Sequence, residues 1–450
     1  MHGSIKRFLS VLGFALLICG TVTGTATAES VKIAWDASLS SGVAGYIIRI
    51  GTKSGVYSAS VDAGNQTSHT LTNLSAGVRY YFTVQGYTAD NVLSPHSNEI
   101  TWTVPIAAAA PLKSGVDLNG DDLADALVHN EVTGAFWAQY SSGTGDFNPG
   151  PQGGWAPIWK IFPAKFNDDQ LTDFLLYDPD GGAWYKAINN GAGAFSYVGG
   201  GWAPGWAVHM MDLNGDGRSD AFLYNPKTGV WVKTVSAGDG TEAFEYASGG
   251  WAPMWDLYKA DFNGDERGDL LLYSPTTGVF YMAINDGGSG FTYFGGGWSA
   301  GWQPVILDLD GDSRSDVFLY HPKWGVWVRC TTAADGMGFS YESGGWAPGW
   351  EVKAAHFNHD DRADLFLYNR SSGIFVKAFN DGNKAFTYHS GGWAAWTTSV
   401  TDLNGDGLSD VLLYSPATGV WVQALSIESG GFTYKGGNWT SNVSPIVAVP

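Results

Sequence analysis

The sequence predicts an all-β chain in which a small sandwich domain precedes a closed ring of seven similar sheets. One observation is a short acidic loop that recurs at intervals of 46 to 49 residues, starting at Asp117, Lys165, Asp212, Asp261, Asp308, His356 and Asp402. A fixed period in this range is typical of repeat architectures. A second observation is that strand-like apolar runs follow every loop, with no helical period over ten residues. Thirdly, the residues before the first loop alternate as β-strands do but lack the loop.

The first 28 residues are expected to be a signal peptide. Two basic residues precede the apolar run Phe8–Cys19, and Ala26-Thr27-Ala28 supplies small residues before a cleavage site at Glu29. An uncleaved membrane anchor is the alternative, but an apolar run of 12 residues is short for a bilayer span. We therefore expect a secreted, extracellular protein without membrane insertion.

Residues 29–104 are expected to form a β-sandwich, because short alternating segments such as Gly45–Thr52 and Tyr80–Tyr87 are separated by turn signals. This stretch resembles a fibronectin type III domain in its early Trp35, its corner from Leu74 to Tyr80 and its closing SNEIT. The resemblance implies that Trp35 lies in the core. The uncharged segment 105–112 is interpreted as a linker.

Residues 113–450 repeat one plan of four short strands. In the copy that begins at Asp212, the acidic loop leads into Ala221–Pro226, a TG turn, Val230–Val235 and then Phe244–Tyr246. A GGW segment and a fourth strand complete the unit. Four strands in about 48 residues are typical of one β-propeller blade. Seven blades are expected, and Pro445–Pro450 is expected to pair with the first blade and close the ring.

The acidic loops are candidate metal sites. Oxygen-bearing side chains at positions 1, 3, 5 and 9, with a glycine turn at position 4, suit a hard cation. Five loops have the full pattern, which predicts about five Ca²⁺ sites, whereas Lys165 and His356 replace the first ligand in the other two. The predicted ligands are Asp117, Asn119, Asp121, Asp125, Asp212, Asn214, Asp216, Asp220, Asp261, Asn263, Asp265, Asp269, Asp308, Asp310, Asp312, Asp316, Asp402, Asn404, Asp406 and Asp410.

These loops resemble the calcium loops of FG-GAP or VCBS repeats, which form integrin-α-like propellers. An EF-hand would need a glutamate at position 12, where apolar residues such as Leu223 stand. A hydrogen-bonded Asx turn without metal is the alternative for all seven loops. A lysine ammonium at position 1 could replace the ion in the Lys165 loop.

Tryptophans recur in the GGW segments in pairs. Because these segments contain Gly and Pro and are expected at the surface, the pairs are candidate ligand contacts. The predicted ligand-binding residues are Trp155, Trp159, Trp202, Trp206, Trp251, Trp255, Trp298, Trp302, Trp346, Trp350, Trp393 and Trp396. A third aromatic set after the TG turn is assigned to packing between blades: Trp137, Trp184, Trp231, Phe280, Trp327, Phe375 and Trp421. Strand tyrosines such as Tyr177 are assigned to the same packing.

The charge and residue composition of the chain limit the classes of function that it could have. A formal charge of −19 argues against nucleic-acid binding, which needs a basic surface. The repeat plan is similar to that of seven-bladed propeller lectins, which implies multivalent carbohydrate binding without specifying a sugar. A protein-binding adhesin or matrix component is the alternative. The histidines share no register and form no recognisable triad, so an enzyme that cleaves polysaccharide is the least favoured class and no catalytic residue is predicted.

Overall fold

The computed structural model describes residues 29–38, 40, 42–74, 79–103, 115–191, 193–237, 243–382, 386–427 and 430–447. The described chain is all β, with 34 strands. It divides into two compact units, Met1–Ala110 and Pro111–Pro450. The predicted signal peptide and the 105–112 linker lie outside the described residues.

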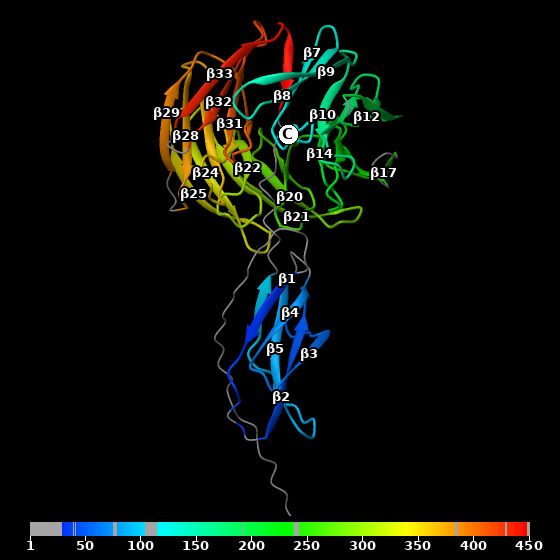
Figure 1. The fold of residues 1–450 in the computed structure, drawn as a ribbon, viewed down its shortest axis with the longest axis vertical. Coiled ribbons are helices and arrows are strands. Elements are labelled where there is room, and N and C mark those ends of the chain that lie inside the picture. The colour runs from blue at the N-terminus through cyan, green and yellow to red at the C-terminus, as the bar shows by residue number, and fades with distance from the viewer. Residues whose placement is uncertain are drawn as a thin grey trace, which may run out of the picture. The chain divides into compact units, whose positions relative to one another are not determined.

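The first unit is a β-sandwich, as the sequence predicted. One sheet pairs β1 (Glu29–Ala34) with β4 (Ser68–Leu74). The other has the order β3-β2-β5-β6, formed by Ala59–Gly64, Val43–Gly51, Arg79–Thr88 and Ile100–Thr103 (Figure 1). Trp35 packs in the core with Ile48 and Phe82. The predicted corner at residues 75–78 lies outside the described residues.

The second unit is a seven-bladed β-propeller, also as predicted. Its strands form seven four-stranded antiparallel sheets, numbered here blade 1 (β34-β7-β8-β9), blade 2 (β10–β13) and so on to blade 7 (β30–β33). The first strands of successive blades lie side by side and are therefore innermost. They are β10 (Lys160–Ala164), β14 (Ala207–Met211), β18 (Asp256–Ala260), β22 (Gln303–Leu307), β26 (Glu351–Ala355), β30 (Thr397–Thr401) and β34 (Val443–Ile446).

The remaining strands follow in order toward the perimeter. The second strands are β7 (Ala126–Asn130), β11 (Asp173–Tyr177), β15 (Asp220–Tyr224), β19 (Asp269–Tyr273), β23 (Asp316–Tyr320), β27 (Asp364–Asn369) and β31 (Asp410–Tyr414). The third strands are β8 (Ala135–Ser141), β12 (Ala183–Asn189), β16 (Val230–Ser236), β20 (Val279–Asn285), β24 (Val326–Thr332), β28 (Ile374–Asn380) and β32 (Val420–Ser426). The outermost strands are β9 (Phe147–Gly154), β13 (Phe195–Gly201), β17 (Phe244–Gly250), β21 (Phe291–Gly297), β25 (Phe339–Gly345), β29 (Phe386–Gly392) and β33 (Phe432–Asn438).

The ring closes through the C-terminal strand. β34 pairs antiparallel with β7, with Val443 opposite Asn130 and Ile446 opposite Leu127. Figure 1 shows this red strand between β33 and the cyan strands of blade 1. The pairing begins two residues earlier than Pro445, where the sequence analysis placed it. Closure gives β7 a partner on the side that would otherwise be an open sheet edge.

The packing between blades is mostly aromatic. Second strands such as β11 are buried at every position because a neighbouring blade covers each of their faces. Trp184 lies between blades 2 and 3 with Tyr177, Trp202 and Phe244. In blade 1 the predicted Trp137 packs against the cluster between blades 7 and 1. The register equivalent of Trp184 there is Phe136, since Phe136 lies opposite His129 as Trp184 lies opposite Tyr177.

The glycines of the GGW segments make room for these rings. A Cβ on Gly249 would lie 2.2 Å from Trp231, and one on Gly200 would lie 2.4 Å from Trp184. The third-strand aromatic therefore lies flat over a glycine of the outermost strand. This packing explains why a glycine lies two residues before the first tryptophan in every blade.

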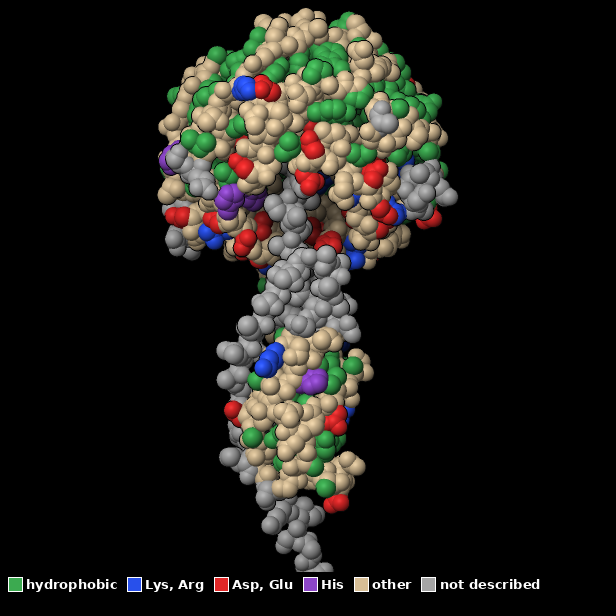
Figure 2. Space-filling view, viewed as in Figure 1, with side chains coloured by type: hydrophobic (Ala, Val, Ile, Leu, Met, Phe, Trp, Pro, Cys, Tyr) green, Lys and Arg blue, Asp and Glu red, His purple; other side chains and the backbone are tan. Residues whose placement is uncertain are grey.

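Strand direction assigns the loops to two rims of the ring. The acidic loops connect first to second strands, whereas the GGW segments and the TG turns lie at the opposite ends of these strands. We call these ends the acidic rim and the aromatic rim. Figure 2 shows the same division in the ring, with carboxylates gathered toward one end and hydrophobic side chains toward the other.

Candidate functional site

Each full acidic loop wraps around its position-1 carboxylate. In the Asp212 loop, the Asp212 carboxylate accepts hydrogen bonds from the backbone N–H of Asn214 (3.1 Å), Gly215 (2.7 Å) and Gly217 (2.7 Å). The Asn214 amide in turn donates to Asp216 at 3.0 Å. Positions 1, 3 and 5 thus form a continuous set of Asx turns that holds their oxygens on the inside of the loop.

Backbone geometry separates the five full loops from the other two. Positions 4 and 6 have positive φ in all five, for example Gly215 at 81° and Gly217 at 79°. Position 6 keeps this conformation even where it is not glycine, as at Glu266 (65°). The equivalent residues of the Lys165 and His356 loops do not have positive φ: Asp168, Gln170, His359 and Asp361. Only the five loops that were predicted to bind metal therefore share one backbone fold.

The position-9 aspartate has a structural role in every blade. Asp220 is fully buried and accepts hydrogen bonds from the backbone N–H of Leu213 (2.9 Å) and Ser236 (2.7 Å), which joins the loop to the end of β16. Asp173, in the Lys165 loop, makes the equivalent bonds to Phe166 and Asn189, both at 2.8 Å. This aspartate therefore supports the blade whether or not the loop has a full ligand set.

Burial raises the pKa of these carboxyls. The pKa rises to about 7 in the full loops, although the two backbone N–H groups act in the opposite direction: Asp125, Asp220, Asp269, Asp316 and Asp410. In the other two loops burial raises the pKa of Asp173 and Asp364 to about 6. Nearby carboxylates contribute to the rise in the full loops, at positions 1 and 5 in four of them and at positions 1 and 3 for Asp316. A bound divalent cation would offset this repulsion.

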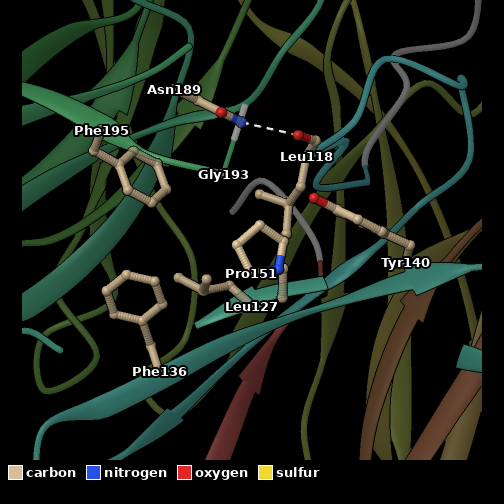
Figure 3. A pocket seen from close by; sticks show the side chains of 9 residues that line it. Leu118, Leu127, Phe136, Tyr140, Pro151, Asn189, Gly193 and Phe195 are labelled. Carbon is tan, nitrogen blue, oxygen red and sulfur yellow. Dashed lines mark hydrogen bonds between the residues drawn. The ribbon is translucent and has the colours of Figure 1, made fainter. Parts of the chain in front are cut away.

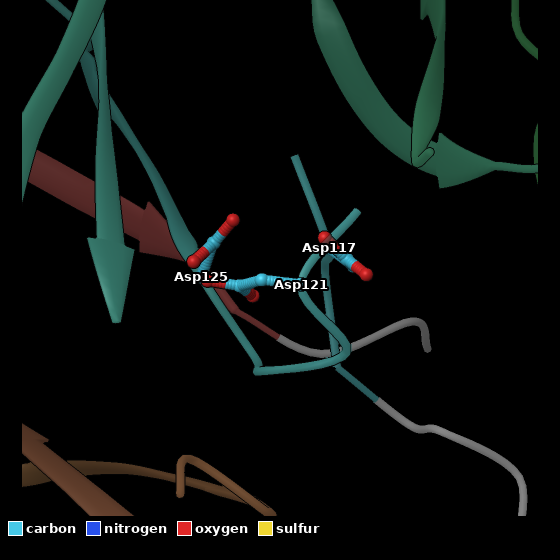
Figure 4. A group of neighbouring side chains, drawn as sticks. All are labelled: Asp117, Asp121 and Asp125. Atoms are coloured by element: carbon cyan, nitrogen blue, oxygen red, sulfur yellow. The ribbon is translucent and has the colours of Figure 1, made fainter. Parts of the chain in front are cut away.

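Carboxylate oxygens converge in two of the loops. One oxygen each from Asp117, Asp121 and Asp125 lies within 4.8 Å of the others, and Figure 4 shows the three side chains meeting at the loop. The second group is Asp308, Asp310 and Asp316. An all-oxygen set of this kind suits Ca²⁺ or Mg²⁺ rather than zinc. These two clusters could hold a metal ion.

Arginine pairs with carboxylates in the two incomplete loops, as Arg267 does with Asp265 and Arg314 with Asp312 in two of the full loops. Arg218 donates two hydrogen bonds of 3.0 Å to Asp168 of the Lys165 loop, from the neighbouring blade. In the His356 loop, Arg362 pairs with Asp360 at 2.9 Å. Burial lowers the pKa of His356, which favours the neutral ring. Arginine, rather than the position-1 lysine or histidine, therefore supplies the ion pair with the loop carboxylate.

The acidic loops are also linked to one another around the rim. The backbone N–H of Ser219 donates to the Lys165 carbonyl oxygen at 2.6 Å, and the Ser219 hydroxyl accepts from Lys165 N–H at 2.8 Å. Six backbone bonds of this type connect successive loops from Asp117 to Ser409. A change in one loop is thus transmitted directly to the next blade.

On the aromatic rim, the first tryptophan of each GGW segment joins two blades. The indole N–H of Trp155 donates to the Tyr197 hydroxyl at 2.9 Å, and that of Trp251 donates to Tyr293 at 2.8 Å. Trp202, Trp298, Trp346 and Trp393 make the same bond to Tyr246, Tyr341, Tyr388 and Tyr434. Trp439 donates instead to Gln139 at 3.2 Å. These tryptophans are buried or half-buried, so each has a packing role beside any contact with ligand.

The second tryptophan of each pair lies at the start of an innermost strand. All six are half-buried: Trp159, Trp206, Trp255, Trp302, Trp350 and Trp396. In four of them the backbone N–H donates to a strand tyrosine hydroxyl; for example, Trp396 N–H donates to Tyr368 at 2.9 Å. Whether either tryptophan of a pair binds ligand stays a prediction.

The sequence analysis missed the most exposed aromatic residues. One tyrosine on each outermost strand of blades 2 to 7 faces solvent, for example Tyr197 at 50% exposure and Tyr246 at 55%. In blade 5, Trp324 is 59% exposed and stacks on the buried His321 ring at 3.8 Å. The FxY pattern and the replacement of Thr by Trp324 in a TG turn were signals that could have identified them.

A cavity of about 20 Å³ lies between blades 1 and 2, where Figure 3 shows Phe136, Phe195 and Pro151 facing one another. Ala138 lines it at the register position that Lys186 fills in blade 2. In blade 3 the equivalent Lys233 spans to the next blade and donates to Asn285 Oδ1 at 2.7 Å. The cavity thus lies at the position where blades 2 and 3 have a lysine side chain. It has room for about one water molecule.

Comparisons with known proteins bear on the fold. Residues 20–105 match the sequence model of the fibronectin type III domain, which confirms the resemblance of the first unit. No curated protein matches the chain. No helix in the described residues is both long and apolar enough to cross a membrane.

Solved structures similar to this chain have low identity to it. A quinonprotein alcohol dehydrogenase-like protein from Bacteroides thetaiotaomicron is 8% identical, with a TM-score of 0.42, covering 94% of this chain and 95% of that one. The dihydro-heme d1 dehydrogenase NirN is 13% identical, with a TM-score of 0.45, covering 75% and 77%. Apo AztD from Citrobacter koseri is 9% identical, with a TM-score of 0.42, covering 72% and 98%.

Proposed function

We propose that this protein is a secreted, calcium-stabilised binding protein that holds carbohydrate at several places on its aromatic rim. The observation that carries the proposal is the repeated arrangement of half-buried tryptophan and exposed tyrosine in blades 2 to 7. Aromatic faces with neighbouring hydroxyls suit sugar rings, which have apolar C–H faces and polar edges. Several weak sites on one rigid ring favour a polymer or a cell surface through effective concentration.

The proposed role of calcium is to stabilise the acidic rim. The five full loops share one backbone fold and offer carboxylate and amide oxygens at positions 1, 3, 5 and 9. Backbone carbonyls or water would complete a shell of six to eight oxygens. The resemblance to FG-GAP or VCBS propellers supports the same assignment. The Lys165 and His356 loops are left out because they lack the position-1 carboxylate and the positive-φ residues that the five full loops share.

The test of carbohydrate binding is a glycan array probed with the full chain, with and without EDTA. We expect binding to several glycans, and weaker binding in EDTA because the loops lose their ions. No binding to any glycan would contradict the proposal. Release of reducing ends or unsaturated sugars from a bound polysaccharide would point instead to an enzyme, which we do not propose.

A second candidate is a protein-binding adhesin or matrix component, favoured by the fibronectin type III domain at residues 20–105. Such a protein would bind no glycan on the array but would bind a purified host-surface or matrix protein. The same two measurements therefore separate the candidates.

A further inference from the structure

Blades 2 and 4 differ from the other blades at one cross-strand pair. On the third strand, the residue after the packing aromatic is Tyr185 in blade 2 and Tyr281 in blade 4. Valine occupies this position in four other blades, Val232, Val328, Val376 and Val422, and Trp137 occupies it in blade 1. The residues opposite the two tyrosines are Gly199 and Gly295. Serine is opposite Val232, Val328 and Val376, and glycine is opposite Val422.

Each tyrosine requires a glycine opposite it for steric reasons. A Cβ on Gly199 would lie 2.4 Å from Cε1 of Tyr185, and a Cβ on Gly295 would lie 2.4 Å from Cε1 of Tyr281. Each tyrosine ring therefore lies over the backbone of the outermost strand, where a serine could not fit. Blades 2 and 4 thus both have Tyr and Gly at the positions where blades 3, 5 and 6 have Val and Ser.

This exchange places three aromatic rings next to one another in each of the two blades, and we call this group a corner. Tyr185 meets Trp159 at 5.6 Å with an interplanar angle of 84°, and meets Tyr197 at 6.4 Å and 89°. In blade 4, Tyr281 meets Trp255 at 5.6 Å and 86°, and meets Tyr293 at 6.5 Å and 89°. The two corners therefore have nearly the same geometry.

The corners stay open to solvent and offer hydroxyl groups. Tyr185 is 40% exposed and Tyr281 38%. Within the described part of the chain, neither of their hydroxyls has a hydrogen-bond partner. The hydroxyls of Tyr197 and Tyr293 accept an indole N–H each and keep their own proton to donate. Perpendicular apolar faces with uncharged donors and acceptors match a ligand that has C–H faces and hydroxyl edges.

We propose that the corners Trp159–Tyr185–Tyr197 and Trp255–Tyr281–Tyr293 are two equivalent sugar subsites. This inference rests on the proposed carbohydrate binding and makes it specific: two main sites per chain, in blades 2 and 4, rather than one at every tryptophan pair. A glycan that reaches both corners binds more tightly than one that fills a single corner.

The test removes each corner by substituting its Tyr–Gly pair with the Val–Ser pair that another blade has at the same positions. Tyr185→Val with Gly199→Ser reproduces the Val232–Ser248 pair of blade 3, and Tyr281→Val with Gly295→Ser does the same in blade 4. The probe is the best-bound oligosaccharide from an array of defined glucan, mannan, galactan and chitin hexamers, titrated by calorimetry. We expect about two sites in the native chain, one in either double variant, and at least tenfold weaker binding when both corners are removed.

Two matched variants complete the design. Trp324→Thr restores the common TG turn in blade 5 and is expected to leave the stoichiometry at two. Val232→Tyr with Ser248→Gly should create a third corner in blade 3, since Trp206 and Tyr246 already occupy the other two positions there. Melting curves of all variants confirm that the ring is folded.

The outcomes separate this inference from the proposed function. Unchanged stoichiometry and affinity after removal of both corners would overturn the inference while leaving carbohydrate binding intact. Loss of binding in Trp324→Thr alone would move the subsite to blade 5 and would equally overturn it. A native chain that binds no glycan overturns both proposals.

Discussion

The ninth residue of the acidic loop has a structural role beside its predicted role as a metal ligand. The sequence pattern identifies this aspartate as a metal ligand because it completes the 1, 3, 5, 9 spacing. In the structure it also accepts two backbone N–H groups in every blade, including the two blades whose loops lack the first ligand. The pattern could not separate these roles, because both need a carboxylate at the same position.

Substitution of this aspartate should destabilise the ring even without metal. Asp173→Ala removes the acceptor of Phe166 and Asn189 N–H, and leaving these buried donors unpaired costs about 2–4 kcal/mol. Asp220→Ala should cost about the same in EDTA, but more than Asp173→Ala in calcium. Urea unfolding of the full chain in both conditions measures the difference. Equal losses in calcium would argue against an ion in the Asp212 loop.

The raised pKa values predict an unusual pH dependence for the calcium-free protein. Burial raises the pKa of Asp220 and its four counterparts to about 7, above the usual value of about 3.8. The folded state therefore binds more protons than the unfolded state between about pH 4 and pH 7, so this contribution to stability is lost as the pH rises through that window. In EDTA, the urea midpoint should fall from pH 5 to pH 7. With calcium present the fall should be smaller or reversed, because the ion requires the deprotonated carboxylates.

At the scale of the blade, the GGW segment has a packing role in addition to its predicted role as a binding loop. Its position between strands and its Gly and Pro content predicted a surface role. The rings that occupy the space above Gly200 and Gly249 come from another strand, so the sequence spacing alone could not predict them. The bond from Trp155 to Tyr197 spans 42 residues and two blades, and was missed for the same reason.

Two adjacent glycines of blade 3 give a direct test of this packing. Gly249→Ala would place a methyl group 2.2 Å from Trp231, whereas the nearest atom to a Cβ on Gly250 is 3.9 Å away. We expect Gly249→Ala to destabilise the ring by about 1–3 kcal/mol, because the indole must move in a close-packed interface. Gly250→Ala should change the free energy of unfolding by less than about 0.5 kcal/mol. Urea titration followed by tryptophan fluorescence compares the two; equal effects would contradict the packing argument.

At the scale of the whole molecule, the repeat period correctly predicted the number of blades, and the alternating segments before the first loop predicted the sandwich. The closing strand was predicted with a start two residues too late. The period could predict the number of blades because each blade needs its neighbours to bury its faces, so identical spacing implies identical stacking. The period could not predict contacts between residues that are far apart in the sequence or that depart from the repeat. Examples are the ring of Tyr185 over Gly199 and the stacking of Trp324 on His321. The shift from Trp137 to Phe136 in blade 1 has a similar cause, since only strand pairing fixes the register.

Metal binding should raise the stability of the ring as a unit. Backbone bonds link successive acidic loops, so ions in five loops would stabilise the whole rim and not five separate sites. We expect millimolar calcium to raise the melting temperature of the EDTA-treated chain by more than 5 °C, and magnesium to raise it less. Differential scanning calorimetry measures both shifts, and an unchanged transition would count against calcium in the loops.

The closing strand should control whether the ring remains a monomer. β34 is the partner of β7, and Val443 packs with Trp421 and Trp439 across the junction between blades 7 and 1. Val443→Asp places a carboxylate in this buried cluster and should detach the strand, because an unpaired buried charge costs several kcal/mol. The exposed edge of β7 can then pair with another chain, so size-exclusion chromatography should show dimers or larger species. Ser444→Ala on the same strand, which loses only a hydrogen bond to Glu131, should remain monomeric. A monomeric Val443→Asp variant with an unchanged urea midpoint would show that the ring does not depend on this closure.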